Sequence, residues 1–279
     1  MTILVFGRTG QVATELARLP DVLCLGRKVA DLTDPAACAD IVKSHRPRAV
    51  INAAAYTNVD RAEQEERIAH LVNAESPKAI AQACADIEVP FVHISTDYVF
   101  DGTGQTPWTP DARTCPQNVY GRTKQSGEVA IRDVGGRFAI LRTSWVFSPH
   151  RENFVKSMLG LGATREVLRV VADQIGGPTP ARDIALACHT IANELIDVPH
   201  KTGVYHLAGT PDCSRAEFAR KIFAAAQVSC DVEDILTSEF PTPAKRPVNS
   251  RLNCESLECE FGIPRPDWRS YLQDQFADG

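Results

Sequence analysis

The stretch VFGRTGQVATEL, residues 5–16, places Gly7 and Gly10 directly after an apolar run and before a segment of helical periodicity. Glycine permits a tight turn and close backbone approach, and the start of the following helix presents unpaired N–H groups that suit a phosphate. The pattern G-x-x-G-x-x-A, which ends at Ala13, is less specific than G-x-G-x-x-G and also fits an ordinary strand-to-helix turn. Because it joins the first strand to the first helix, we interpret it as a dinucleotide-binding turn.

Apolar runs alternate with helical segments on both sides of this turn. The runs, which we expect to be buried strands, cover residues 2–6, 22–25, 49–55, 91–96, 138–147 and 167–173. The expected helices between them cover residues 10–19, 35–45, 75–86 and 120–133. Such alternation is typical of a parallel sheet with helices on both faces. We predict an α/β fold, a doubly wound parallel sheet (Rossmann) with a smaller, loop-rich C-terminal substrate lobe.

The alternation weakens after residue 148, where proline- and glycine-bearing segments interrupt it. We assign residues 1–148 to the dinucleotide-binding domain and expect residues 181–210 to return to it. Residues 149–180 and 211–279 are expected to form the substrate-binding lobe. Two helices are expected in this later part, at residues 181–196 and 214–226. Ligands of such sheets bind beyond the carboxyl ends of the strands, so functional residues are expected at that edge.

Composition excludes several classes of protein. The 279 residues are 44% hydrophobic and 23% charged, which is a globular profile. A net charge of −5 and the absence of any Lys/Arg run longer than two residues argue against nucleic acid as a partner. No segment has the length of a membrane span, and the chain begins on an apolar strand without a basic leader, so we predict a cytoplasmic protein. Nine scattered cysteines favour reduced thiols, and we expect no metal site.

The loop after the second expected strand, LGRKVADLTD at residues 25–34, indicates the form of the dinucleotide. Gly26 stands where an NAD site usually carries an acidic residue for the ribose 2′-hydroxyl, and Arg27 and Lys28 follow. Two cations favour a 2′-phosphate and therefore NADPH, with NADH possible, although a solvated basic loop is the alternative. Asp31 and Leu32 are placed to flank an adenine. The third strand ends in Ala53, Ala54 and Ala55, small residues that let a cofactor lie against the backbone.

The expected fourth strand, FVHIST, ends in Thr96, and NVYGRTK follows at residues 118–124. Tyr120 and Lys124 are four residues apart, so they share one face of a helix. An ammonium group near a tyrosine favours the phenolate, and Thr96 can supply a hydrogen bond to the same reacting oxygen. An isolated Y-x-x-x-K pattern is most often an amphipathic helix face. Together with the glycine turn, it indicates acid–base catalysis by Thr96, Tyr120 and Lys124.

These residues resemble the catalytic set of the extended short-chain dehydrogenase/reductase superfamily. Longer blocks, among them NAAAYTNVDRAE, STDYVFDGTG, RTSWVF, DQIGGPT and FPTPAKRPVNSRLN, resemble the dTDP-4-dehydrorhamnose reductase family and run in its order from residue 2 to 253. The resemblance implies that Tyr120 is the acid, that Lys124 tunes it and holds the nicotinamide ribose, and that Thr96 orients the carbonyl. Ala13 in place of a third glycine and Tyr56 in place of a frequent histidine depart from the family pattern.

The resemblance also implies which residues bind the ligands. The dinucleotide would be lined by Gly7, Gly10, Gln11, Val12, Arg27, Lys28, Asp31, Leu32, Ala53, Ala54, Ala55, Tyr56, Tyr120 and Lys124. A dTDP-linked 4-keto-6-deoxysugar would be bound by Thr96, Asp97, Trp145, Asn153, Gln174, Arg246 and Asn249. Glu15 matches one position of a magnesium-bridged dimer in some relatives, but one glutamate is not a site, and a monomer or homodimer is expected.

Two other functions fit the same pattern. A sugar-nucleotide epimerase or dehydratase shares the fold and the catalytic set, although such dehydratases typically follow the threonine with Asp-Glu, whereas Thr96 is followed by Asp97 and Tyr98. A non-enzymatic protein is the second, because the regulatory subunit of methionine adenosyltransferase resembles the same family and binds NADP. The leading expectation is reduction of the C4 carbonyl of dTDP-4-dehydro-L-rhamnose to dTDP-L-rhamnose with NAD(P)H.

Overall fold

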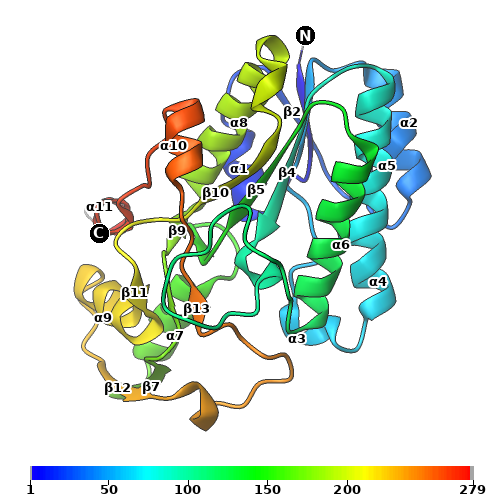
Figure 1. Cartoon of the computed structure of the whole chain (residues 1–279). Coiled ribbons are helices and arrows are strands. Elements are labelled where there is room, and N and C mark those ends of the chain that lie inside the picture. The colour runs from blue at the N-terminus through cyan, green and yellow to red at the C-terminus, as the bar shows by residue number, and fades with distance from the viewer. Residues whose placement is uncertain (1, 277–279) are drawn as a thin grey trace.

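Six parallel strands form the main sheet of the computed structural model, which describes residues 2–276 (Figure 1). In spatial order the strands are β10 (Gly203–Leu207), β5 (Phe138–Thr143), β4 (Phe91–Thr96), β3 (Ala49–Asn52), β1 (Ile3–Phe6) and β2 (Val22–Leu25). The predicted doubly wound parallel sheet is confirmed. The strand order reverses between β1 and β3, and ligands of such sheets bind at the carboxyl ends beside this point.

Helices cover both faces of the sheet because the strand residues point alternately to either side. Ile3 and Val5 of β1 pack in the core beneath α1 (Gln11–Leu16), α8 (Ala181–Asp197) and α10 (Glu255–Phe261). Leu4 and Phe6 pack in the opposite core beneath α2 (Pro35–His45), α5 (Ser76–Asp86) and α6 (Val119–Val134). Figure 1 shows α2, α5 and α6 together on one side of the sheet and α1 and α8 on the other.

The expected strand at residues 167–173 does not belong to the main sheet. It forms β7 (Val167–Val171), which pairs in parallel with β12 (Asp231–Ile235) in a separate two-stranded sheet. Val167 is 51% exposed, so this run is covered on one face only and lacks the burial that a central parallel strand requires. The sixth strand of the main sheet is β10, which pairs with β5 and which the apolar pattern did not single out.

The expected strand at residues 138–147 is also divided. β5 ends at Thr143 and β6 (Val146–Phe147) pairs with β9 (Thr179–Pro180). The break falls at Trp145, whose φ is 49°, a left-handed conformation that interrupts an extended strand.

A second core lies beside the carboxyl edge of the sheet. It is built from α7 (Phe154–Gly162), α9 (Arg215–Ala225) and α11 (Trp268–Asp274), with Phe147, Phe218 and Trp268 at its centre. Ser214 and Glu217 form a capping box that fixes the start of α9. Short strands β8 (Ile175–Gly176), β11 (Cys213–Ser214) and β13 (Asn249–Ser250) form a small sheet here. Figure 1 shows α7, α9, β7 and β12 gathered at one end of the molecule.

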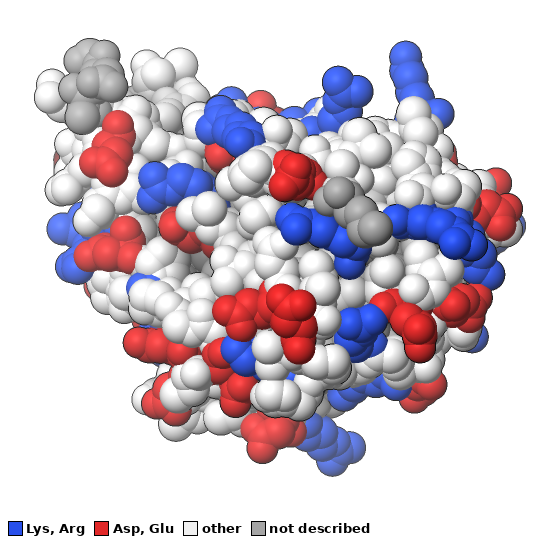
Figure 2. All heavy atoms as spheres, turned by 90° about the horizontal axis from the view of Figure 1, so that it is seen from above, with Lys and Arg blue, Asp and Glu red and all other residues white. Residues whose placement is uncertain are grey.

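Three further helical segments lead from β3 into α5. They are α3 (Val59–Ala62), α4 (Glu66–His70) and a π-helical turn at Leu71–Glu75. Within residues 2–276, no helix is both long and apolar enough to cross a membrane. On the face shown in Figure 2, basic and acidic side chains are interspersed and neither sign forms a continuous field.

Candidate active site

The glycine turn brings the end of β1 against the end of β3. Gly7 has a φ of +121°, and a Cβ there would lie 3.3 Å from both the Ala53 carbonyl and the Ala13 side chain. Ala13 is fully buried, so it fits where a third glycine is common. Gly10 is the N-cap residue of α1, and a Cβ there would meet only the Ala53 oxygen, at 4.0 Å. The backbone at Gly10 therefore stays open while Gly7 makes the close turn.

Gln11 ties this turn to the second core. Its Oε1 accepts hydrogen bonds from Ser148 Oγ at 2.8 Å and from Asn153 Nδ2 at 3.1 Å. Asn153 is also the N-cap residue of α7, where its Oδ1 accepts from the Lys156 N–H. The amide of Asn153, expected near the sugar, therefore holds the start of α7 against the glycine turn. Val12 is buried in the core beneath α1.

Three cations surround the loop after β2. Arg27 and Lys28 are exposed, and Arg27 Nε donates to Asp31 Oδ2 at 3.0 Å in an ion pair open to solvent. Arg8 is the third cation. Its side chain lies next to this loop, 3.6 Å from the position that a Cβ on Gly26 would take. Arg8 was not selected from the sequence, although its place directly after Gly7 was a usable signal. Leu32 is buried in the core beneath α2.

The segment from Ala53 to Tyr56 is held by two buried asparagines. Asn52 Oδ1 accepts from the Ala54 N–H at 3.1 Å, and Asn73 Oδ1 accepts from the Tyr56 N–H at 2.8 Å. Ala53, Ala54 and Ala55 remain partly exposed at the end of β3. The Tyr56 hydroxyl donates to Glu65 at 2.6 Å, so its ring is anchored from outside the turn.

The residues around the turn fit a dinucleotide that carries a 2′-phosphate. No side chain covers the backbone at Gly10, and the alanines after β3 cover it only with methyl groups. A flat ligand can therefore approach the backbone closely at both places. Exposed guanidinium and ammonium groups stand at the loop after β2, where a phosphate would need them.

Thr96 and Tyr120 meet at the carboxyl end of β4. Burial raises the pKa of Tyr120, and the nearby Thr96 hydroxyl opposes this effect. The charge of Asp97 and the neighbouring Tyr98 raise this pKa further. Tyr120 is therefore protonated at neutral pH and can donate a proton.

Lys124 is buried one turn further along α6, with 1% of its surface exposed. Its Nζ donates to the carbonyl of Ile94 at 2.7 Å and lies 3.0 Å from Nε2 of His93. Burial lowers the pKa of Lys124 to about 8, although the Glu128 carboxylate opposes this effect. Lys124 thus shares the Tyr120 face of α6 but is anchored to β4.

Two glycines let α6 approach its neighbours closely enough to present this face. A Cβ at Gly121 would collide with the carbonyl of Tyr98, and one at Gly127 would collide with the carbonyl of Asn73. Asn118 caps the helix by accepting from the Gly121 N–H at 2.8 Å. The position of Tyr120 and Lys124 is therefore set by backbone contact along the helix.

Asp97 joins the sheet to the C-terminal segment. Its Oδ1 accepts from the Thr96 hydroxyl at 3.1 Å, and its Oδ2 accepts from the Ser250 hydroxyl. Burial raises the pKa of Asp97 to about 6, while these two hydrogen bonds and the charge of Arg215 lower it. Ser250, which was not selected from the sequence, therefore contacts Asp97, whereas its neighbour Asn249 has other partners. The Asn249 amide donates to the carbonyls of Thr103 and Thr106 and braces that loop.

Trp145 lies between a bare backbone and a guanidinium. A Cβ at Gly176 would fall 2.9 Å from the indole, so only glycine leaves room for the ring. On its other side the guanidinium carbon of Arg215 lies 3.7 Å from the ring centroid. Burial, with the charge of Arg246, lowers the pKa of Arg215 to about 10. Arg215 was not predicted, because a lone arginine at a helix start carries no sequence signal.

The other two expected substrate residues lie in the same region. The side-chain Nε2 of Gln174 donates to Thr237 Oγ1 at 3.2 Å. The backbone carbonyl of Gln174 accepts from the backbone N–H of Arg215 at 3.2 Å. Arg246 Nη2 donates to Asp60 at 2.6 Å, and its Nη1 is buried without a partner among residues 2–276. Arg215 and Arg246 are close enough for each charge to act on the other. This pair of cations suits an anion.

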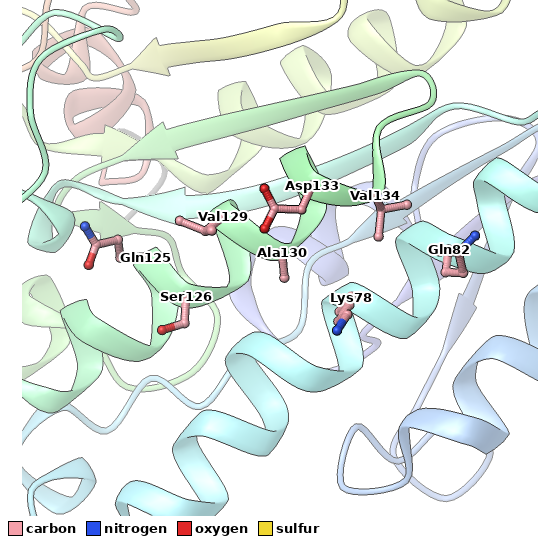
Figure 3. Close-up of a pocket in the computed structure, with 8 residues that line it drawn as sticks. All are labelled: Lys78, Gln82, Gln125, Ser126, Val129, Ala130, Asp133 and Val134. Carbon is pink, nitrogen blue, oxygen red and sulfur yellow. The ribbon is translucent and has the colours of Figure 1, made fainter.

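A separate surface hollow of about 600 Å³ lies between α5 and α6 (Figure 3). Its lining residues are Lys78, Gln82, Gln125, Ser126, Val129, Ala130, Asp133 and Val134. None of the expected site residues lines this hollow, so it is distinct from the site at the carboxyl edge of the sheet.

Comparisons with known proteins agree with this geometry. Residues 1–279 match the family model described as RmlD substrate binding domain. The dTDP-4-dehydrorhamnose reductases of Sinorhizobium fredii and Escherichia coli are 44% and 39% identical over 96% of this chain and over 94% and 95% of their own lengths.

Solved structures give the same result. The chain is similar to a dTDP-4-dehydrorhamnose reductase from Clostridium acetobutylicum, with a TM-score of 0.92, 35% identity and coverage of 100% and 99% of the two chains. The Bacillus anthracis protein of that name, solved in complex with NADP, gives a TM-score of 0.91 and 34% identity over 100% of both chains. By sequence and by fold, the chain belongs to the dTDP-4-dehydrorhamnose reductase family.

Proposed function

We propose that this enzyme reduces the C4 carbonyl of dTDP-4-dehydro-L-rhamnose with NADPH and releases dTDP-L-rhamnose, the last step of dTDP-rhamnose synthesis. The observation that carries the proposal is the protonated, partly buried Tyr120 next to the Thr96 hydroxyl at the carboxyl end of β4. NADPH, when bound, supplies the hydride for the carbonyl carbon. It would be held by the turn at Gly7 and Gly10, by the alanines after β3, and by Arg8, Arg27 and Lys28 at the 2′-phosphate.

The protein supplies the proton. Tyr120 donates its hydroxyl proton to the carbonyl oxygen as that oxygen gains charge. Asp97 Oδ1 accepts the hydrogen bond that the Thr96 hydroxyl donates, and this fixes the direction of the Thr96 O–H bond. Lys124, on the same face of α6, contributes the positive charge that favours the phenolate and contacts the nicotinamide ribose.

The dTDP-sugar is proposed to lie between Trp145 and the C-terminal segment. A 6-deoxyhexose has an apolar methyl edge that an indole can cover. Arg215 and the unpartnered Nη1 of Arg246 supply positive charge for the diphosphate. Gln174 lies next to Arg215 and is a further candidate contact.

The position of Asp97 argues against dehydratase activity. Elimination of water needs both an acid and a base beside the sugar, and the carboxylate next to Thr96 is that of Asp97, which Thr96 and Ser250 hold by hydrogen bonds. The next residue is Tyr98, which offers no carboxylate. A cytoplasmic location and a monomeric or homodimeric state stay predictions.

The test is an NADPH oxidation assay with a small panel of dTDP-4-keto-6-deoxysugars. Product analysis should give dTDP-L-rhamnose from dTDP-4-dehydro-L-rhamnose. Failure to oxidise NADPH with this sugar, while NADPH binds, would overturn the substrate assignment. Co-purification with a methionine adenosyltransferase, combined with no turnover, would favour the regulatory-subunit alternative.

A further inference from the structure

Three buried side chains form a hydrogen-bonded chain from the cofactor turn to the catalytic helix. Asn52 Nδ2 lies 3.1 Å from His93 Nδ1, and His93 Nε2 lies 3.0 Å from Lys124 Nζ. Each of the three residues is at most 1% exposed. The proposed mechanism uses only Lys124, so Asn52 and His93 have no assigned role in it.

The contacts of Asn52 fix which atom donates and which accepts in each of these hydrogen bonds. The Ala54 N–H can only donate, and it donates to Asn52 Oδ1 at 3.1 Å. The other amide atom facing His93 is therefore the NH₂ group, which can only donate. His93 Nδ1 must accept this hydrogen bond and carries no proton. Burial holds the pKa of His93 well below its usual value, so the ring is neutral and its one proton resides on Nε2.

This tautomer points an N–H at Lys124. Nζ already donates to the Ile94 carbonyl at 2.7 Å. An ammonium group has only N–H bonds and would face the Nε2–H donor to donor. An amine has a lone pair that accepts this hydrogen bond. The two contacts of Nζ, one donated and one accepted, therefore match the amine form of Lys124.

We propose that His93 is a positioning residue: fixed in one tautomer by Asn52, it presents an N–H to Lys124 and biases the free enzyme toward the uncharged amine. The proposal rests on the proposed function, because Lys124 is there the cation that favours the Tyr120 phenolate. It makes the charge of Lys124 depend on the backbone of the cofactor turn, through Ala54 and Asn52.

The other charged groups around Lys124 do not reverse this bias. On α6, the Glu128 carboxylate favours the ammonium, but it is paired with Arg142 of β5 through hydrogen bonds of 2.9 and 2.6 Å. Ser95 of β4 also donates to Glu128, at 2.6 Å. Tyr120, on the same face of α6, is uncharged. Burial lowers the pKa of Lys124 to about 8, and donation from His93 Nε2 to Nζ acts in the same direction.

The tautomer can be observed without any turnover. In the free enzyme labelled with ¹⁵N-histidine, the ring signals of His93, identified among seven histidines by their loss in a His93→Phe variant, should show a bare Nδ1 and a protonated Nε2. In an Asn52→Asp variant both side-chain atoms facing Ala54 and His93 are acceptors, so the proton should move to Nδ1. A wild-type ring protonated on Nδ1 overturns the proposal.

The pH profile tests the effect on Lys124. The basic limb of kcat/KM reports ionisation in the free enzyme, and Asn52→Asp should move it upward by about one pH unit or more, because Nε2 becomes an acceptor for the ammonium. The added negative charge acts in the same direction. Asn52→Asp in a His93→Phe background measures that charge alone, and the shift there should be smaller. Equal shifts in the two backgrounds overturn the proposal.

A matched control separates this effect from the loss of any histidine. His189 lies on α8 and bonds to Asn193, far along the chain from the site, and His189→Phe should leave the basic limb unchanged. If the wild type fails to reduce the dTDP-keto sugar, the proposed function fails while the tautomer measurement still decides this inference. Normal turnover with a proton on Nδ1 would instead overturn the role of His93 and leave the proposed function standing.

Discussion

The guanidinium carbon of Arg215 lies 3.7 Å from the centroid of the Trp145 ring. The contact joins the first residue of α9 to a residue between β5 and β6, and it places a flat cation over an aromatic plane. The ring is fixed from behind by Gly176. Trp145 and Arg215 therefore form one wall, in which an aromatic ring and a positive charge are in direct contact.

Replacing the charge of this wall should weaken substrate binding. Arg215→Met keeps a long side chain over Trp145 but removes the cation, so KM for the dTDP-keto sugar should rise by roughly 10- to 100-fold, the cost of a lost charged hydrogen bond. NADPH affinity should be unchanged. Arg220→Met on the same helix, whose side chain pairs with the exposed Asp234, is the control and should leave KM alone. An unchanged KM in Arg215→Met would remove this residue from the substrate site.

Removing the phenol should stop the chemistry and spare the cofactor. Tyr120→Phe deletes the proton donor while keeping the ring, so kcat should fall by about 10²- to 10⁴-fold. NADPH affinity, measured by fluorescence titration, should stay within a few-fold of wild type. Retained turnover would show that another group supplies the proton.

The cations after β2 should discriminate between the two nicotinamide cofactors. Arg27→Ala combined with Lys28→Ala should weaken NADPH by roughly tenfold or more and NADH far less, since only NADPH carries the 2′-phosphate. Arg8→Ala should act in the same direction because its side chain packs near Gly26. Lys78→Ala, on α5 at the surface hollow, removes one positive charge away from this loop and is the control for Arg8→Ala. Equal losses of affinity for NADPH and NADH would show that these cations do not bind the 2′-phosphate.

The buried His206 should make the fold sensitive to acid. Burial and the charge of Arg142 lower its pKa to about 3, below the ordinary value of 6.5. The unfolded chain therefore binds this proton first, and stability contributed by the neutral ring is present above pH 6.5 and lost as the pH falls toward 3. The loss should be at most about 1.4 kcal/mol per pH unit from this group. Urea unfolding of His206→Gln should show a flatter pH dependence in this window, and an identical slope would contradict the assignment.

Sequence patterns predicted the sheet because its strands depend on local burial. β1, β3 and β4 are almost entirely buried and are followed by helical segments, so pattern and structure agree. The pattern did not separate β7 from the main sheet, because pairing with β12 is decided by residues 231–235, far along the chain. β10 was overlooked because membership of a sheet is decided by its neighbour β5.

The residues of the site also fall into two groups, those that a local motif predicted and those that it did not. Thr96, Tyr120 and Lys124 lie in local motifs and were selected from the sequence, and the structure places Thr96 and Tyr120 in contact. Arg215 and Ser250 reach the site through long-range packing, and neither carries a local signal. Asn249 shows the limit of a motif: its segment was selected, but the alternation of side chains along β13 sends Ser250 to Asp97 and Asn249 to the loop at Thr103.

The hydrogen bond from Ser250 to Asp97 should set the acid limb of activity. Asp97 must be ionised to accept from both Thr96 and Ser250, and its pKa is already raised to about 6 by burial. Ser250→Ala removes a hydrogen bond that lowers this pKa, so the acid limb of kcat/KM should move to higher pH, and the free energy of unfolding should fall by about 1–3 kcal/mol. Ser76→Ala, which removes another buried hydroxyl bonded to the Leu32 carbonyl, should reduce stability without moving the limb. If both variants lose stability and neither shifts the acid limb, the ionisation of Asp97 does not control the orientation of Thr96, and the contact with Ser250 only holds the C-terminal segment against the sheet.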